Sequence, residues 1–351
     1  MADRIHTLPG PRTVTALGSA AAELLDLAAR GQPRPAIDFV LGLLDDGLVA
    51  DRIIMEVLAP VQLEVGERWE ANQWDVADEH VTTAAVDGAL GALALHTAVP
   101  DLNRGKVLVA CAEGEHHTMP ARMGAELLRG DGWETTFLGG SLPADDLRRY
   151  AGVTNPDVVV ISCTVPLFLP GARRCFAAVT DLGLPAIAAG AAFGHDDVRA
   201  RRLGASGWIG PTASLTAALE ARTLEPKTAP IPPEAVALEL SAEDLQRSCL
   251  AAMGERMTQL ASYTPQQLAS TRTDLGYILS YLRTSIDLGD DEIFGSFISW
   301  LARVCATRGV PLVVLDRSLD IIGEVLASAG MTEAARLCAA HRATRAPQAP
   351  H

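Results

Sequence analysis

The stretch KVLVACAEGEHHTMP, residues 106–120, decides the fold because an apolar run passes directly into a polar turn. Residues 106–110 are rich in valine and leucine, a composition typical of a strand that is buried on both faces. Two glutamates and two adjacent histidines follow within residues 113–117. The carboxyl ends of parallel strands are where open α/β sheets bind their ligands. The stretch therefore predicts an α/β domain with a site after its first strand.

Four further apolar runs extend this pattern over residues 104–222. Short β-rich segments alternate there with helical ones, which indicates a parallel sheet covered by helices on both sides. The five expected strands lie in KVLVACA, WETTFLG, DVVVISC, PAIAAG and GWIGP. We predict a flavodoxin-like, doubly wound, five-stranded parallel sheet.

Residues 14–99 precede the sheet domain and are predicted to form a four-helix bundle. Ile54, Leu58, Val61, Val65 and Trp69 recur at spacings of three and four, which is the period of one helix face. Pro60 lies within that helix and is expected to kink it.

The fourth helix of this bundle is expected to begin at Asp75, with Asp78 three residues further on completing the N-cap. Its inward face is predicted to consist of unusually small side chains. That stripe is Ala77, Val81, Ala84, Gly88 and Ala92. Such a face either admits a second helix at close range or leaves room for another group.

The remaining segments complete an α/β plus all-α architecture. Residues 1–13 are expected to be a tail, residues 223–240 a proline-rich linker, and residues 241–343 a C-terminal helical domain. Three helical stretches of that last segment end on glycine, as helix C-termini often do.

Composition limits the function classes. The chain has 351 residues, a net charge of −14 and a mean hydropathy of +0.18. It contains no apolar run of about 18 residues and no apolar signal region at its start, which predicts a cytoplasmic protein that does not span a membrane. Basic residues do not cluster with aromatic ones, which argues against direct nucleic-acid binding. Six scattered cysteines indicate reduced thiols.

The polar turn after the first strand has a specific chemical interpretation. A histidine there can bind a metal through one ring nitrogen, while Glu115 engages the other and fixes the tautomer. Zinc takes three or four protein ligands, and no compact set is present in this turn. A single histidine suits a metal already held by a macrocycle. The alternative is a solvated loop histidine.

The stretch EGEHHTMPARMGAELLRGDGWETTFLG resembles the cobalamin-binding domain with an acid-x-His-x-x-Gly signature. The resemblance implies that His117 is the lower axial cobalt ligand and Glu115 its acidic partner. Pro120 stands where the family has glycine. The family's second element corresponds to Ser162-Cys163-Thr164, and its Gly-Gly-x-x-Phe element to AGAAF, Ala189 to Phe193. The cofactor-binding positions implied in these later turns are Ser162, Thr164, Gly190, Phe193 and Gly210.

The helical segment VGERWEANQWDVADEHVTT resembles the cap of cobalamin-dependent light-sensing repressors. The matching residues are Trp69, Glu79 and His80, which the resemblance places over the upper face of adenosylcobalamin. Glu70 stands where that family has the histidine that binds cobalt after illumination, and His80 is the candidate substitute. Residues 1–13 are too few for the family's DNA-binding domain, so a relative with another output is expected.

A cobalamin module joined to a C-terminal helical domain resembles the photocobilins, which hold cobalamin together with the linear tetrapyrrole biliverdin. A bilin needs cations for its propionates and aromatic surfaces for its rings. The candidate residues are Tyr277, Tyr281, Arg283, Trp300 and Arg303. The alternative is that these tyrosines and Trp300 belong to the core and the arginines to a solvated face.

Three functions follow as hypotheses. The first is a light sensor without enzymatic activity, in which photolysis of adenosylcobalamin changes the arrangement of domains or of a homodimer and so signals to a protein partner. The second is an enzymatic role as the corrinoid methyl carrier of a methyltransferase. The third is a cobalamin-storage protein or anti-repressor. Preference for methylcobalamin would favour the second, and cobalamin binding without a light response the third.

Overall fold

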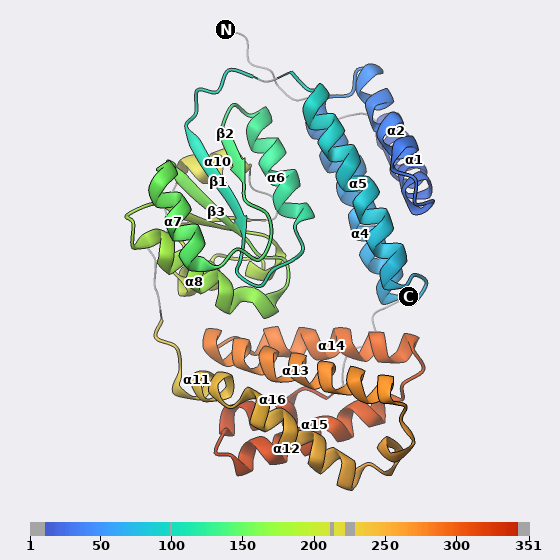
Figure 1. Cartoon of the computed structure of the whole chain (residues 1–351), viewed down its shortest axis with the longest axis vertical. Helices are drawn as coiled ribbons and strands as arrows, with labels where there is room; N and C mark the ends of the chain where they lie inside the picture. Colours follow the sequence, from blue (N-terminus) through green and yellow to red (C-terminus); the bar gives the residue numbers. More distant parts are fainter. Residues whose placement is uncertain (1–10, 99, 211–213, 222–228, 343–351) are drawn as a thin grey trace. The chain divides into compact units, whose positions relative to one another are not determined.

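The computed structural model describes residues 11–98, 100–210, 214–221 and 229–342 (Figure 1). The chain folds into two compact units. The first unit contains the described residues up to Val109 together with Thr118–Phe137. The second contains Ala110–His117 and the described residues from Leu138 onward. The three segments expected from the sequence are therefore redistributed, because most of the first strand, the following helix and the second strand belong to the same unit as the N-terminal helices.

The N-terminal part of the first unit is helical, as predicted. Its elements are α1 (Pro11–Ala29), α2 (Pro33–Asp45), α3 (Ala50–Ile53), the π-helical segment η1 (Ile54–Leu58), α4 (Ala59–Glu70) and α5 (Val76–His96). The helix starting at Ala50 does not break at Pro60. A π-helical segment ends at Leu58, and the Ala59 N–H donates to Ile54 O five residues back, so the hydrogen-bond register widens just before the proline that lacks an N–H.

Helix α5 confirms the predicted N-cap and corrects the predicted inward face. Asp75 accepts hydrogen bonds from the N–H groups of Ala77 and Asp78 at 2.8 and 2.9 Å, and its own N–H donates to Asp78 Oδ2 at 3.0 Å. The buried face consists of Thr82, Ala85, Val86, Ala89, Leu90 and Leu93.

The small-residue stripe of α5 was therefore assigned to the wrong side of the helix. Ala77, Val81 and Ala84 are exposed, Val81 by 42%, and Gly88 and Ala92 are half-buried. The larger side chains one position along fill the core instead, since they bury more apolar area per residue.

The core of the first unit joins the helical bundle to α6 (Met119–Gly130). Met119 and Met123 of α6 belong to the same buried cluster as Ile54, Leu58 and Leu90. An ion pair between Arg122 of α6 and Asp87 of α5 adds a polar contact. The helix that begins just after His117 is thus anchored on the bundle.

The predicted five-stranded parallel sheet is confirmed, with the strand order β2-β1-β3-β4-β5. The strands are β1 (Lys106–Cys111), β2 (Glu134–Phe137), β3 (Val158–Ser162), β4 (Ala186–Ala189) and β5 (Gly207–Ile209). Lys106 pairs with Glu134, Val159 with Ala186, and Ile187 with Gly207. This is the flavodoxin-like order, in which the chain changes direction across the sheet between β1 and β3.

Helices and short turns follow the strands. They are α7 (Ala144–Thr154), η2 (Pro166–Phe168), α8 (Leu169–Thr180), η3 (Ala191–Phe193), α9 (Val198–Leu203) and α10 (Leu215–Ala221). Helix α8 lies almost entirely inside the protein, which matches the near-continuous apolar pattern of β3 beneath it.

The C-terminal part of the second unit is helical, as expected. Its elements are α11 (Pro233–Leu240), α12 (Ala242–Arg256), η4 (Thr258–Ser262), α13 (Pro265–Leu288), α14 (Asp291–Thr307), α15 (Leu312–Ser328) and α16 (Thr332–Ala340). The linker expected over 223–240 holds helix α11 in its second half. Prolines start this helix rather than exclude it, because proline fits the first helical turn.

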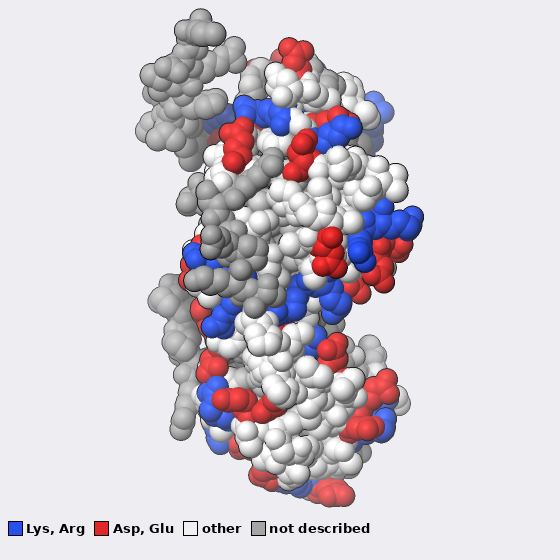
Figure 2. All heavy atoms as spheres, turned by 90° about the vertical axis from the view of Figure 1, so that its left-hand side faces the viewer, with Lys and Arg blue, Asp and Glu red and all other residues white. Residues whose placement is uncertain are grey.

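Charged groups of both signs share the surface. On the face drawn in Figure 2, Lys and Arg side chains are interleaved with Asp and Glu. Among the described residues, no helix is long and apolar enough to cross a membrane. The six cysteines are free thiols, and all except the half-buried Cys305 are buried.

Candidate functional site

The turns after β1 and β3 meet at the point where the sheet changes direction. The N–H of Ala112, just after β1, donates to Ser162 O at the end of β3 at 2.8 Å. The N–H of Cys163 in turn donates to Ala189 O at the end of β4 at 2.9 Å. Three strand ends are therefore held side by side by backbone bonds. Chains leaving adjacent strands in opposite directions open a crevice at such a point.

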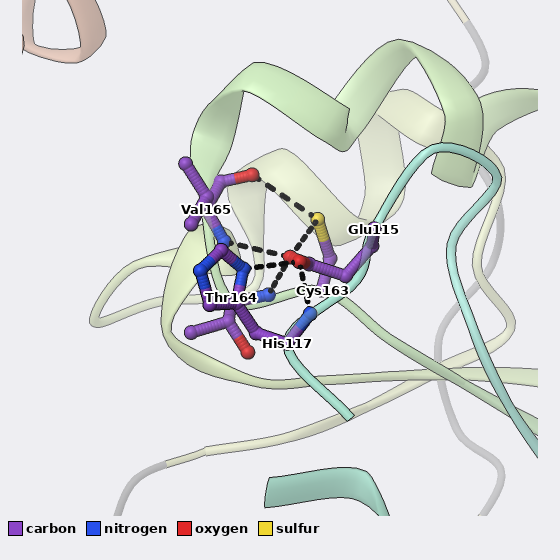
Figure 3. Close-up of polar contacts among 5 residues, drawn as sticks. All are labelled: Glu115, His117, Cys163, Thr164 and Val165. Atoms are coloured by element: carbon purple, nitrogen blue, oxygen red, sulfur yellow. Dashed lines mark hydrogen bonds and ion pairs between the residues drawn. The ribbon is translucent and has the colours of Figure 1, made fainter. Parts of the chain in front are cut away.

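Glu115 lies at this point with a side chain that is 0% exposed, and His117 lies beside it with a side chain that is 54% exposed. The carboxylate oxygen Oε1 is 2.5 Å from His117 Nδ1 and accepts the His117 backbone N–H at 2.9 Å (Figure 3). One oxygen thus holds both the backbone and the ring of the histidine.

The other oxygen of Glu115 binds the turn after β3. Oε2 accepts the N–H groups of Thr164 and Val165 at 2.9 and 3.0 Å, and the Cys163 thiol lies 4.0 Å away. Burial raises the pKa of Glu115, but the hydrogen bonds from the His117 ring and from the backbone of His117, Val165 and Thr164 outweigh it. The pKa therefore lies below its ordinary value, and the group is a carboxylate.

This arrangement prepares His117 for metal binding. A carboxylate at Nδ1 favours the tautomer with the proton on that nitrogen, which places the ring lone pair on Nε2 and raises its basicity. Within the described parts of the chain, no group of three or more His, Cys, Asp and Glu side chains is arranged to hold a metal. The geometry therefore offers a single oriented imidazole ligand.

One further feature of this edge favours a polar ligand, and another shows how closely its turns pack. Thr164 Oγ1 is buried and has no hydrogen-bond partner, which is costly unless a bound group supplies one. Gly190 follows β4 with a φ of +103°, and a Cβ there would lie 2.3 Å from Cys163 O. Only glycine allows the turns after β3 and β4 to approach this closely.

The other residues predicted for these turns divide into two groups. Ser162 ends β3 and is buried beside the crevice. Phe193 is fully buried and packs against Phe176 with ring centroids 6.0 Å apart, so it belongs to the core. Gly210 follows β5, where a Cβ would lie 2.9 Å from the Trp208 ring.

The predicted upper-face residues lie in the first unit, at one end of the α4–α5 hairpin. Trp69 is in the last turn of α4, and Glu79 and His80 are in the first turns of α5. Trp69 and Glu79 are half-buried, and His80 is exposed. The short connection of residues 71–75 brings all three to the same end of the hairpin.

The residues predicted to bind a bilin are only partly assembled. Tyr281 stacks on Phe297 at 3.9 Å, and Phe297 lies 6.0 Å from Trp300, so three aromatic rings form a continuous stack. Tyr277 is 45% exposed and Arg303 is also exposed. Arg283 is ion-paired with Glu239 at 2.7 Å, so this predicted cation is already neutralised within the protein.

Sequence reasoning missed the groups that hold Glu115 from the far side. The type of residue at position 165 could not reveal the N–H of Val165 as a donor, because this N–H is a backbone group. Gly171 in α8 was missed as well, although a Cβ there would lie 1.9 Å from Glu113 O. A glycine in the first turn of a helix that packs on the sheet was the available signal of close backbone approach.

Comparison with known proteins agrees with this geometry. A family model described as a B12 binding domain matches residues 105–220, and a second model with the same description matches residues 20–94. The chain is a cobalamin-binding protein.

Among curated proteins, this cobalamin-binding protein is 37% identical over 135 residues to the HTH-type transcriptional repressor CarH of Myxococcus xanthus. The match covers 38% of this chain and 44% of the repressor, so the chain spans less than half of that relative.

Among solved structures, the chain is similar to the monomethylamine corrinoid protein of Methanosarcina barkeri, with a TM-score of 0.49 and 17% identity over 55% of this chain and 93% of that one. It is also similar to a cobalamin-binding protein of Desulfitobacterium hafniense, with a TM-score of 0.30 and 22% identity over 58% and 95% of the two chains.

Proposed function

We propose that this cobalamin-binding protein is a light sensor, in which His117 would hold the cobalt of cobalamin and the α4–α5 hairpin would respond to loss of the cofactor's adenosyl group. The observation that carries the proposal is the Glu115–His117 pair, with Nδ1 held at 2.5 Å and a fully buried carboxylate. The partial identity to a repressor supports a regulatory rather than an enzymatic role. The chemistry supplied by adenosylcobalamin would be a cobalt–carbon bond that visible light breaks.

The residues of the crevice have separate tasks in this proposal. Glu115 keeps the His117 ring oriented and basic, because its Oε1 accepts from the ring and the backbone together. Thr164 Oγ1 supplies a buried hydroxyl for the nucleotide tail. Gly190 lets the turns after β3 and β4 pack closely against each other at that edge. Ser162 lies at the same edge.

The residues of the α4–α5 hairpin provide the response. Trp69, Glu79 and the exposed part of the small-residue stripe, Ala77 to Ala84, would contact the adenosyl group in the dark and lose those contacts after illumination. A ligand shifts a two-state equilibrium only through contacts that differ between the states. Release of the adenosyl group is therefore expected to change the domain arrangement or the association of subunits, and so the contact with a protein partner.

A second chromophore is part of the proposal. Trp300, which is half-buried next to the buried rings of Phe297 and Tyr281, would offer its aromatic surface to a planar tetrapyrrole such as biliverdin. Arg303 and the exposed Tyr277 lie on the same two helices, α13 and α14. Arg283 drops out of the candidate set because Glu239 already pairs with it.

The test is spectroscopic. The protein is loaded with adenosylcobalamin in the dark, illuminated with green light, and followed by absorption and small-angle scattering. The proposal expects photolysis together with a change in the scattering profile or the subunit number. Full photolysis with an unchanged profile would refute light signalling. Preference for methylcobalamin, with methyl transfer to a thiol, would instead identify a corrinoid carrier.

A further inference from the structure

The end of α13 and the start of α14 form a corner, residues Asp287–Asp290, that is tied to the sheet domain within the second unit. Arg173 of α8 donates through Nη2 to Asp287 Oδ1 at 2.8 Å, and the two side chains are 10% and 1% exposed. The Nη1 of the same arginine donates to Ala229 O at 3.0 Å. A buried ion pair of this kind fixes relative position, since removing one partner leaves an uncompensated buried charge.

A second arginine ties the corner to the turn after β4. Arg199 of α9 donates through Nε to Asp290 Oδ2 at 2.8 Å and through Nη1 to Ala192 O at 3.0 Å. Ala192 lies in η3, directly after Gly190. The close approach extends to Gly289, where a Cβ would lie 2.9 Å from the Arg202 guanidinium. The corner is therefore linked by side chains to one of the turns that border the crevice.

Helix α13 is also packed against the turn after β3. It contacts η2, residues Pro166–Phe168, which follows Thr164 and Val165 without an intervening residue. The ring of Phe168, the last residue of η2, lies 3.1 Å from the position that a Cβ would take at Gly114 in the turn after β1.

We propose that Arg173–Asp287 and Arg199–Asp290 are positioning pairs for the cobalamin site. They hold α13 on the segment 163–168, which keeps the N–H groups of Thr164 and Val165 directed at Glu115, and Glu115 in turn orients His117. The C-terminal helical domain is thus a structural support of the axial ligand as well as an appended domain. By thermodynamic linkage, cobalamin binding must then stabilise the packed corner by the same factor. The inference rests on the proposed role of His117 as a cobalt ligand.

The test compares Asp287→Asn with Asp244→Asn. The first removes the charge of the buried pair while preserving shape, and the second removes one partner of the exposed Asp244–Arg247 pair in the same domain. Hydrogen exchange of the amides in 163–168 is measured in the cobalamin-free protein, and hydroxocobalamin affinity is measured in the dark. Asp287→Asn is expected to speed exchange at Thr164 and Val165 and to weaken affinity about 5-fold or more. Asp244→Asn should match the wild type.

Two further measurements separate positioning from general stability. Arg199→Gln breaks the second pair together with the hydrogen bond to Ala192 O, and leaves Arg173–Asp287 intact. It should show the same local effect in smaller degree, which keeps the proposal testable if Asp287→Asn does not fold. In protein labelled with ¹⁵N-histidine, the nitrogen splitting of the cobalt(II) EPR signal should report weakened histidine ligation in both variants. Folded variants with wild-type exchange in 163–168 and wild-type splitting would overturn the inference.

The wild-type protein separates a failure of the positioning role from a failure of cobalt ligation. All measurements are made in the dark, so failure of light signalling leaves them unaffected. If the wild-type EPR signal shows no histidine nitrogen, the proposed ligation by His117 fails. If it does show histidine, and cobalamin does not slow exchange at the corner Asp287–Asp290, the positioning role fails while the ligation stands.

Discussion

The turn around Glu115 and the aromatic stack around Phe297 were both suggested by residue type, yet the structure assembles them differently. At Glu115 both carboxylate oxygens are bound by groups from two strand ends, and the histidine ring is fixed. At Phe297 three rings stack as they would in a hydrophobic core, and the predicted cation Arg283 pairs with Glu239 of the same chain. Strand ends that converge bring polar groups from distant parts of the chain together and so form a site. Aromatic residues at helical spacing mainly pack against one another.

The largest expected effect concerns His117, in the turn around Glu115. His117→Ala removes the imidazole that Glu115 orients, so cobalamin affinity should fall ~100-fold or more, beyond the loss typical of a supporting residue. Absorption titration with hydroxocobalamin measures it. His116→Ala is the matched control, since this neighbour is exposed. Equal affinities of the two variants would contradict the assignment of His117.

The next effect concerns the carboxylate. Glu115→Gln keeps the shape but removes the charge that fixes the His117 tautomer, and cobalamin affinity should fall about 10- to 100-fold. Glu113→Gln serves as control, because Glu113 is in the same turn but pairs with the exposed Arg174 at 2.8 Å. If both variants bind like the wild type, the orientation of the ring does not depend on Glu115.

Residue types predicted the sheet, the polar turn after its first strand and the pairing of Glu115 with His117, because each depends on local period or on neighbours two residues apart. They did not predict the inward face of α5, since its small stripe and its larger buried face lie only one residue apart along the helix. They also did not predict the donors of Thr164 and Val165. Backbone N–H groups carry no residue signature, and only tertiary folding brings them to a carboxylate 49 and 50 residues earlier.

A smaller effect tests whether the aromatic stack is more than packing. Trp300→Leu keeps an apolar group beside Phe297 but removes the outer ring, so biliverdin affinity should fall by about 0.5–1.5 kcal/mol, the value of an aromatic pair. Absorption titration in the red measures it, with Tyr263→Leu as a control outside the stack. A wild-type protein that does not bind biliverdin would leave the stack as core alone.

The smallest expected effect concerns Asp291, which follows the corner Asp287–Asp290 and is exposed where Asp287 is buried. Asp291 pairs with Arg336 at 2.9 Å on the surface, and the hydrogen bond from Arg336 holds the pKa of this carboxyl below its usual value. A lowered pKa stabilises the folded state above the ordinary pKa and loses that contribution as pH falls through the folded value. Because the pair is half-exposed, Asp291→Asn should cost only about 0.2–1 kcal/mol at neutral pH. The difference in Tm from the wild type should shrink as the pH falls below the ordinary pKa of an aspartate, about 3.9. A constant difference across this range would show that the effect does not arise from the charge of Asp291.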